Sequence, residues 1–146
     1  MTDILHAKCK KSDNPETIAS TIDILRRSLS VFRNACGLAA NQIDINESIC
    51  VINVKREIIF VNPEIISNSK GVFRIFEGCV SFPNEIVQTK RFAKIIVRSS
   101  NHPDMIFEYK DADDLNNLEL ACVQHEIDHL NGIDIFFRKS TIEWRK

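Results

Sequence analysis

The sequence predicts an α+β fold in which antiparallel strands pack around one central helix, with an amphipathic helix near the N-terminus. Two observations support this class. Apolar residues recur at helical spacing near the two ends of the chain. Between them lie short segments rich in β-branched and aromatic residues, separated by turn-forming or charged residues, as is typical of strands. Because no internal repeat or flexible linker interrupts the chain, residues 1–146 are expected to form a single domain.

The first predicted helix begins after Asp13 or Asn14, either of which can cap it, and Pro15 suits its first turn. Apolar residues then recur at steps of four, three, four and three, which places them on one helical face: Ile18, Ile22, Leu25, Leu29 and Phe32. The helix is expected to end before Gly37.

The middle of the chain is expected to form strands of a largely antiparallel sheet. The predicted strands are residues 48–54, 57–63, 71–76, 93–99 and 105–110. A second helical pattern begins near Leu115 and continues to the pair Asn131-Gly132. Gly132 can adopt the left-handed conformation that ends many helices. This second helix carries the sequence His-Glu-Ile-Asp-His and is the one expected to pack at the centre of the strands.

Composition and charge exclude several classes of protein. The chain has 19 basic and 20 acidic residues, a balance that does not indicate nucleic-acid binding. No apolar run approaches the roughly 20 residues of a membrane span, and the first residues lack the pattern of a secretory or transit peptide. The five cysteines are an odd number without a tight framework of spacings, which favours reduced thiols in a cytosol. We therefore expect a cytoplasmic protein.

His125 and His129 are suited to hold a metal ion. They lie about 40° apart around the helix and one turn apart along it, so both imidazoles can reach one ion. Cys122 shares this face, but about 10.5 Å of helix axis separates it from His129, whereas ligand atoms must come within about 2.0 to 2.3 Å of the ion. The third ligand must therefore come from elsewhere. Spacing alone leaves three candidates open: Cys36, Cys50 and Cys79.

Three stretches of the sequence resemble, in order and separation, the signature motifs of peptide deformylases. They read ACGLAANQ at residues 35–42, EGCVS at residues 77–81 and QHEIDHL at residues 124–130. The resemblance covers roughly residues 14–137. Each motif alone is weak evidence, but three in the same order are a specific signal.

The resemblance implies a metal-binding helix and a catalytic role for its glutamate. One divalent ion would be held by Cys79, His125 and His129, with Glu126 beside it as general acid and base. Fe²⁺ is the ion expected in the cell, although Zn²⁺, Ni²⁺ and Co²⁺ also suit such ligands. Three protein ligands leave a fourth position for water, and a divalent ion can lower the pKa of that water from about 15.7 towards 7. By the same resemblance, the Gln42 side-chain amide and the Val80 backbone N–H would stabilise an oxyanion.

The implied substrate is an N-formylmethionyl nascent peptide, which would be cleaved to formate and a free amino terminus. By resemblance, the methionine side chain would lie against Cys36, Gly37, Leu118 and Cys122. For the two cysteines, a purely structural role as small buried residues has equal weight. The peptide could also pair as an added strand with the backbone of the first and second motifs. The expected protein is a monomer without membrane or nucleic-acid contacts, and a place near the ribosome is compatible with such substrates.

Several positions depart from the family pattern. Ala35 replaces a glycine and Cys36 an aliphatic residue, both where the substrate should approach. Val80 replaces a leucine, and an arginine often found shortly after the second motif is absent around Ile86. The N-terminal Asp-x-x-Leu-Arg pattern is missing, and the chain stops soon after FFRKSTIEWRK. We expect a short form without the long C-terminal helix, as in virus-encoded members, located in the bacterial cytosol or in the host cytosol.

Asp128 flanks the two histidines, and Arg91 is its predicted charge partner, which would fix the orientation of the helix. Two other functions compete with deformylation. A metalloprotease of the His-Glu-x-x-His type would use a further histidine or glutamate downstream, but only Gly132 and Asp134 follow closely. The other is a non-catalytic metal-binding homologue. The presence of Glu126 and Gln42 argues against it.

Overall fold

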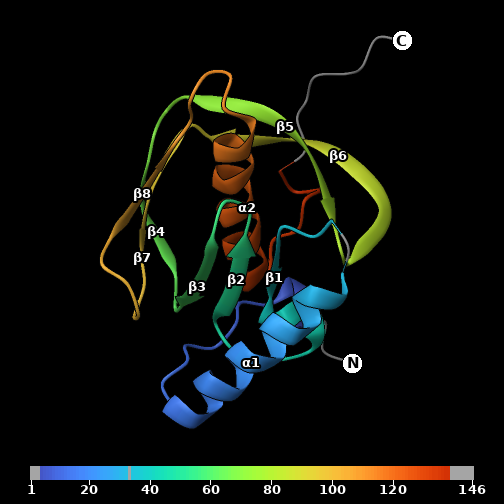
Figure 1. The fold of residues 1–146 in the computed structure, drawn as a ribbon, viewed down its shortest axis with the longest axis vertical. Helices are drawn as coiled ribbons and strands as arrows, with labels where there is room; N and C mark the ends of the chain where they lie inside the picture. The colour runs from blue at the N-terminus through green and yellow to red at the C-terminus, as the bar shows by residue number, and fades with distance from the viewer. Residues whose placement is uncertain (1–3, 33, 139–146) are drawn as a thin grey trace.

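The computed structural model describes residues 4–32 and 34–138 and confirms the α+β class (Figure 1). The helices are α1 (Pro15–Val31) and α2 (Asp114–Leu130), with short 3-10 turns η1 (Ile4–His6) and η2 (Ala40–Ile43). The strands are β1 (Gly37–Ala39), β2 (Ile49–Asn53), β3 (Glu57–Val61), β4 (Glu64–Asn68), β5 (Val72–Cys79), β6 (Phe82–Phe92), β7 (Lys94–Arg98) and β8 (Met105–Glu108).

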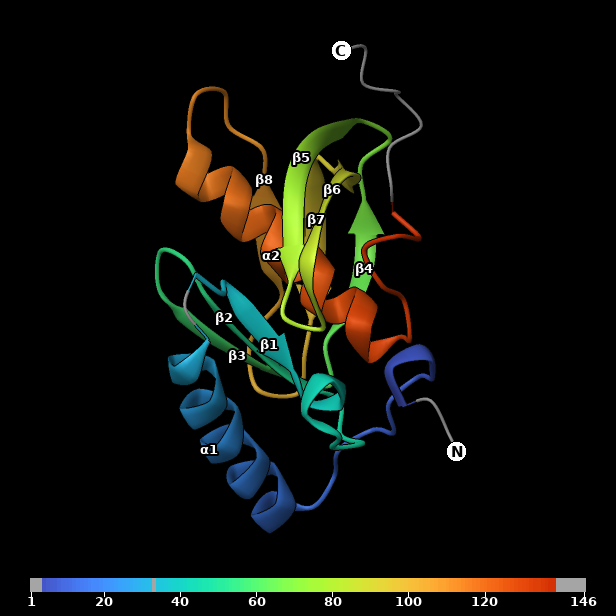
Figure 2. The ribbon, with the colours of Figure 1, turned by 90° about the vertical axis from the view of Figure 1, so that its right-hand side faces the viewer.

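The strands form three antiparallel sheets instead of the one sheet predicted. Their orders are β1-β2-β3, β4-β7-β8 and β5-β6. The α2 helix runs through the middle of the molecule, and the β1-β2-β3 sheet lies between it and α1 (Figure 2). The prediction of a single sheet is wrong because the helix occupies the space that a continuous sheet would need. Local sequence patterns specify strands, whereas their pairing depends on such long-range packing.

The α1 helix has the predicted cap. The Asn14 side-chain oxygen accepts hydrogen bonds from the backbone N–H groups of Glu16 and Thr17, at 3.0 and 3.2 Å. Leu25 is fully buried on the face that packs against β1 and β2. The partners of this apolar face include Leu38, Ile49 and Val51. The N-terminal helix therefore covers the outer face of the first sheet.

The α2 helix is buried around almost its whole circumference. Fourteen of its 17 residues are buried, including both histidines of the metal-binding motif. Its apolar residues share one core cluster with side chains of β2, β3, β7 and β8, among them Ile52, Phe60, Ile95, Val97 and Phe107. Gly132 follows the helix with a φ of 78°, as predicted, and a Cβ there would come within 2.7 Å of the His6 backbone. Polar residues on such a helix need partners inside the protein.

Three strands were not predicted, namely β1, β4 and β6, and β5 extends beyond residue 76 to Cys79. The expected absence of a long C-terminal helix concerns the end of the chain. Residues 139–146 lie outside the described part of the chain. Within residues 4–32 and 34–138, neither helix combines the length and apolar character needed to cross a bilayer.

Candidate metal centre and substrate cleft

Three predicted ligands converge on one point. The Cys79 Sγ lies 3.2 Å from His129 Nε2, which lies 3.1 Å from His125 Nε2. These three ligand atoms all fall within 4.8 Å of one another, and residues 4–32 and 34–138 contain no other such cluster of three or more His, Cys, Asp or Glu side chains. The structure therefore places Cys79, rather than the other cysteines, beside the histidines.

An irregularity in the β5-β6 hairpin brings Cys79 to this position. Gly78 pairs with Ile86, but the next residue, Cys79, pairs with Phe82, so the register shifts between them. Such an irregularity re-aims the side chains at the end of a strand. Cys79 is the last residue of β5 and faces α2, from which both histidines project.

Glu77 orients His125 from the side opposite the ligand cluster. Its carboxylate accepts a hydrogen bond from His125 Nδ1 at 2.8 Å, which leaves Nε2 directed at Cys79 and His129. Arg91 donates two hydrogen bonds to the same carboxylate, each 2.6 Å long. Although burial opposes ionisation, hydrogen bonds from Arg91 and His125 lower the pKa of Glu77 to about 2. Glu77 is thus a buried carboxylate that stays charged.

The predicted ion pair between Arg91 and Asp128 is present. The guanidinium donates to Asp128 Oδ2 at 2.6 Å, and Arg138 donates two further hydrogen bonds of 3.0 Å to the same carboxylate. Arg91 therefore links β6 to α2 at both Glu77 and Asp128. The sequence reasoning missed Glu77 and Arg138. No local pattern identifies Glu77, because the register shift between Gly78 and Cys79 interrupts the alternation of faces along β5.

Replacing Arg91 with leucine is expected to lower the free energy of unfolding by about 3–5 kcal/mol, because it leaves the buried Glu77 carboxylate without its arginine and Asp128 with Arg138 alone. The matched control is Arg98→Leu, which removes a hydrogen-bonded arginine that pairs with Asp104 on the surface. Little change is expected there, because solvent screens an exposed pair. Chemical denaturation of both variants measures the difference. Equal losses of stability would show that the buried network does not hold α2 in place.

Glu126 lies in the wall of the cleft with a free carboxylate oxygen. Its side chain is buried, yet Oε1 has no hydrogen-bond partner among the described residues. Burial raises the pKa of Glu126 to about 7. The carboxyl group is therefore set to gain and lose a proton near neutral pH.

Gly37 provides the space that this carboxylate needs. A Cβ at Gly37 would come within 2.7 Å of the Val51 carbonyl oxygen and 2.8 Å of Glu126 Oε2. It would also lie 3.0 Å from Cys122 Sγ. Only a glycine permits this approach of β1 to α2 without displacing one of these groups.

Gly37→Ala is expected to lower the free energy of unfolding by about 1–3 kcal/mol through overpacking, and to lower the rate of catalysis by shifting the Glu126 carboxylate. Gly71→Ala is the matched control, because a Cβ there would meet only the Ala93 Cβ, at an ordinary 4.0 Å. Its unfolding free energy should stay within about 0.5 kcal/mol of the parent. Chemical denaturation and steady-state kinetics of the two variants test this. If Gly37→Ala behaves like Gly71→Ala, the close approach is not significant.

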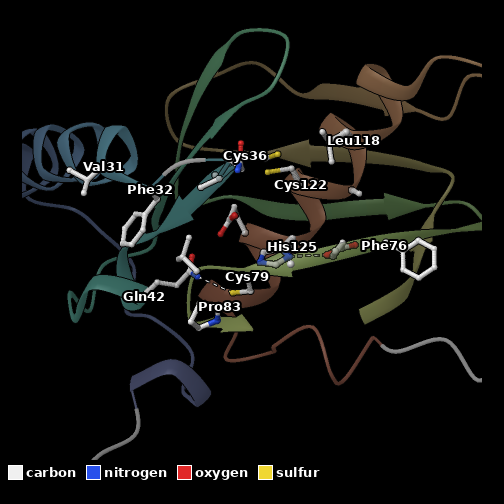
Figure 3. Close-up of a pocket in the computed structure, with 18 residues that line it drawn as sticks. Val31, Phe32, Cys36, Gln42, Phe76, Cys79, Pro83, Leu118, Cys122 and His125 are labelled. Carbon is white, nitrogen blue, oxygen red and sulfur yellow. Dashed lines mark hydrogen bonds and ion pairs between the residues drawn. The ribbon is translucent and has the colours of Figure 1, made fainter. Parts of the chain in front are cut away.

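The Gln42 side chain is fixed so that its NH₂ group faces the ligand cluster. Its Oε1 accepts a hydrogen bond from the Ala39 backbone N–H at 2.9 Å. Its Nε2 is then left to donate towards Cys79 Sγ at 3.3 Å (Figure 3). It also donates towards Ser81 Oγ at 3.2 Å. Val80, the other predicted donor, lies in the short loop between Cys79 and Phe82 and lines the same cleft.

The cleft beside the ligand cluster has a volume of about 700 Å³. All four residues predicted to contact the substrate side chain line it, namely Cys36, Gly37, Leu118 and Cys122. Cys36 and Cys122 lie next to each other, while Val31 and Phe32 flank another part of the cleft (Figure 3). The predicted pocket residues, Glu126 and the ligand residues Cys79 and His125 thus share one cavity.

The three ligand residues fit one divalent cation. A thiolate and two imidazoles are donors that bind Fe²⁺, Zn²⁺, Ni²⁺ and Co²⁺. Burial and the neighbouring charge of His125 lower the pKa of His129 to about 3, so His129 is in the neutral form that binds metals. Burial alone would lower the pKa of His125, but the charge of Glu126 and a hydrogen bond to Cys79 raise it to about 10. A divalent ion bound by these ligands would therefore have to displace the proton of His125.

Known proteins share both the sequence and the fold. Residues 1–143 match the model of a family described as Polypeptide deformylase. A protein from Blochmanniella floridana named "Peptide deformylase" is 39% identical over 105 residues, which are 69% of this chain and 58% of that protein. "Peptide deformylase 1" from Burkholderia multivorans is 41% identical over 100 residues, 66% of this chain and 53% of that protein. The chain thus spans a little over half the length of these curated relatives.

Solved structures agree with these matches. A class I type b peptide deformylase from Acinetobacter baumannii, solved with actinonin bound, superposes with a TM-score of 0.81 at 27% identity, covering 95% of this chain and 93% of that one. The deformylase of the Vibrio parahaemolyticus bacteriophage VP16T, also with actinonin, gives a TM-score of 0.74 at 27% identity, covering 92% and 95%.

Proposed function

Because the chain belongs to the polypeptide deformylase family, we propose that it is a metal-dependent hydrolase that removes the formyl group from the N-terminal formylmethionine of newly made polypeptides and releases formate. One observation carries this proposal. The cluster of Cys79, His125 and His129 lies beside a cleft whose wall contains the free carboxylate oxygen of Glu126. These are the groups that hydrolysis of an amide requires.

We assign one divalent ion to the three clustered side chains, which leave a fourth position open for water. When bound, such an ion acts as a Lewis acid and lowers the pKa of water from about 15.7 towards 7. We expect Fe²⁺ in the cell, and the same donors suit Zn²⁺, Ni²⁺ and Co²⁺. The hydrogen bond from His125 to Glu77 supports this assignment, because it holds the imidazole in one orientation.

Glu126 moves the proton in the proposed reaction. It accepts a proton from the attacking water and passes it to the nitrogen of the departing amine, so that the C–N bond breaks to give a neutral amine. Its raised pKa of about 7 suits both steps at neutral pH. Among the described residues, Glu126 Oε1 has no hydrogen-bond partner that would compete for this proton.

Gln42 and Val80 would stabilise the negative oxygen that develops on the formyl carbon. The orientation of the Gln42 amide supports this role, because its acceptor end is occupied by Ala39 and its donor end faces the cleft. One of its N–H groups would leave Cys79 or Ser81 to meet this charge, while the bond from Ala39 keeps the amide in place. We assign the second donor to the Val80 backbone N–H, in the loop that follows Cys79.

Gln42→Leu is expected to keep the ion but to lower kcat by about 10² to 10³, with a smaller effect on KM, because the amide acts mainly on the developing oxyanion. Ser81→Ala serves as control, since it removes a neighbour of the amide but leaves the amide itself. Metal analysis and steady-state kinetics on a formylmethionyl peptide separate the two variants. A Gln42→Leu protein whose KM rises while kcat is unchanged would assign the amide to substrate binding.

The substrate is expected to lie along β1. The order β1-β2-β3 leaves one edge of β1 without a partner strand among the described residues, and Gly37 on this strand lines the cleft. An extended peptide can pair with such an edge. The methionine side chain would then enter the part of the cleft lined by Leu118 and the two thiols, whose polarisable sulfur atoms suit a thioether.

Formate release from formyl-Met-Ala-Ser tests the proposed function. Protein loaded anaerobically with Fe²⁺ or Ni²⁺ should release formate and leave the Met-Ala-Ser peptide intact. Cleavage of internal peptide bonds without formate release would indicate a metalloprotease. Metal binding without either reaction would indicate a non-catalytic homologue.

A further inference from the structure

Cys36 and Cys122 form a pair of thiols inside the cleft. Cys36 lies in the segment between α1 and β1, and Cys122 lies on α2. Their side chains interact, and their sulfur atoms lie side by side in the close-up of the cleft (Figure 3). Both are free cysteines, and both line the cavity that also contains Glu126. The reaction proposed above uses the chemical reactivity of neither thiol.

We propose that Cys36 and Cys122 are a redox-active pair that forms a reversible disulfide when the protein meets a hydroperoxide, and that this bridge closes the substrate pocket. The formation of the bridge does not depend on the proposed function. The effect of the bridge on activity rests on the proposed function.

The positions of the two residues favour a bridge. A disulfide requires sulfur atoms about 2.05 Å apart, and the two sulfur atoms already lie next to each other in the cleft (Figure 3). Cys122 Sγ lies close to the β1 backbone. A Cβ added to Gly37, the residue next to Cys36, would be only 3.0 Å from this sulfur atom. Cys36 belongs to neither a helix nor a strand, and one backbone hydrogen bond, from the Asn53 N–H to its carbonyl at 2.7 Å, ties it to β2. The Cys36 side chain can therefore turn towards α2 without breaking a strand.

The remaining thiols provide a contrast. Cys9 and Cys50 are buried in the main core and line neither described cavity. Burial raises the pKa of the Cys9 thiol to about 11, so it stays protonated and unreactive. Cys36 is only half-buried, and the neighbouring Cys122 side chain lowers the pKa of its thiol to about 7. Cys79 faces the two histidines as a proposed metal ligand.

The reaction has two steps. The Cys36 thiolate attacks one oxygen of hydrogen peroxide and breaks the O–O bond, which gives a sulfenic acid and hydroxide. The Cys122 sulfur then attacks the sulfenic sulfur and displaces its hydroxyl group, which leaves as water with the Cys122 proton. Two thiols and one hydrogen peroxide thus give one disulfide and two molecules of water. A dithiol reverses the bridge by thiol–disulfide exchange.

The bridge would act on substrate binding rather than on the ligand cluster. It would draw the segment before β1 against α2, into the space assigned to the methionine side chain. A change in fit equivalent to one methylene group in such a pocket alters kcat/KM by about 10- to 200-fold. Metal content should be unchanged, because the cluster of Cys79, His125 and His129 excludes both thiols of the pair.

The test uses nickel-loaded, fully reduced protein treated with hydrogen peroxide after removal of free reductant. Non-reducing digestion and mass spectrometry should find a Cys36–Cys122 linked peptide. In the same sample, kcat/KM on formyl-Met-Ala-Ser should fall by at least about tenfold, nickel should be retained, and dithiothreitol should restore activity. Cys36→Ala should lose no activity on oxidation when it is compared with its own reduced form, and Cys122→Ala should form no linked peptide, because its Cys36 stops at the sulfenic acid. The control Cys9→Ala should respond as the parent does.

Absence of the linked peptide would overturn the pairing, as would oxidation of Cys79 with loss of nickel while Cys36 and Cys122 remain reduced. A linked peptide without loss of activity would overturn the closure of the pocket. If reduced nickel-loaded protein releases no formate, the proposed function fails and with it the effect of the bridge. The peptide map still decides whether the bridge forms.

Discussion

Glu126→Ala is expected to keep the metal ion and the fold, but its rate of deformylation should fall by a factor of about 10² to 10⁴ or more. Glu126 does not belong to the cluster of ligand atoms, so its removal leaves the three proposed ligands in place. Without it, no other carboxylate of the described cleft can take the proton of water, because Glu77, which also lines the cleft, is held by Arg91 and His125. Metal analysis beside steady-state kinetics on formyl-Met-Ala-Ser measures both properties in one preparation.

Two further variants make this test specific. Glu126→Gln keeps the size of the side chain and removes only its acid and base function, so it should lose as much activity as the alanine variant. Glu119→Gln alters another buried glutamate of α2, which does not line the cleft, and should leave the rate near that of the parent. Near-parental turnover by Glu126→Ala would contradict the proposed mechanism.

Cys79→Ser is expected to abolish activity by loss of the ion. A neutral hydroxyl is a much poorer ligand than a thiolate. The affinity for the metal ion should fall by more than the roughly 10- to 100-fold loss that follows removal of a residue hydrogen-bonded to a metal ligand. The apolar core is untouched by this change, because Cys79 lies at the end of β5 and outside both core clusters. Metal content after gel filtration and a thermal unfolding curve show the two effects separately.

The other cysteines provide the controls for this variant. Cys36→Ala, Cys50→Ala and Cys122→Ala should each keep about one ion per chain, since three protein ligands remain. If Cys79→Ser binds metal as the parent does, or if one of the other variants loses it, the assignment of the thiolate ligand is wrong.

The helices could be predicted because their signals are local. The Asn14 cap with Pro15 specified where α1 begins, and the periodic apolar face continued to its end. The strand β6 was missed, since its start contains a proline, Pro83, and two exposed polar residues, Asn84 and Glu85, which do not resemble a strand. The strand β1 has three residues that are all buried, so it lacks the alternation that marks strands. Its extended form depends on pairing with β2.

The candidate site could be predicted only in part. Helical geometry paired His125 with His129 and excluded Cys122, but spacing along the chain cannot choose among distant cysteines. Only the motif around Cys79 did so, and the structure brings this residue to the histidines through the end of β5. The charge partner of Asp128 was also predicted. Glu77, the other carboxylate that Arg91 binds, was not predicted, because its role requires β5, β6 and α2 to meet.

The thiol pair shows the same limit. The sequence placed both cysteines in the predicted substrate pocket without relating one to the other. Their sulfur atoms meet because β1 packs closely on α2 at Gly37. This contact belongs to the tertiary structure and leaves no signal in the sequence.

The most direct test of this account is a metal titration followed by formate release. Metal-free protein is titrated anaerobically with Fe²⁺ or Ni²⁺, and formate release from formyl-Met-Ala-Ser is measured at each ratio of metal to protein. The account predicts no release without metal, a linear rise, and a plateau at about one ion per chain, as three ligands around a single ion require. Formate release by the metal-free protein, or a fully loaded protein that releases none, would contradict it.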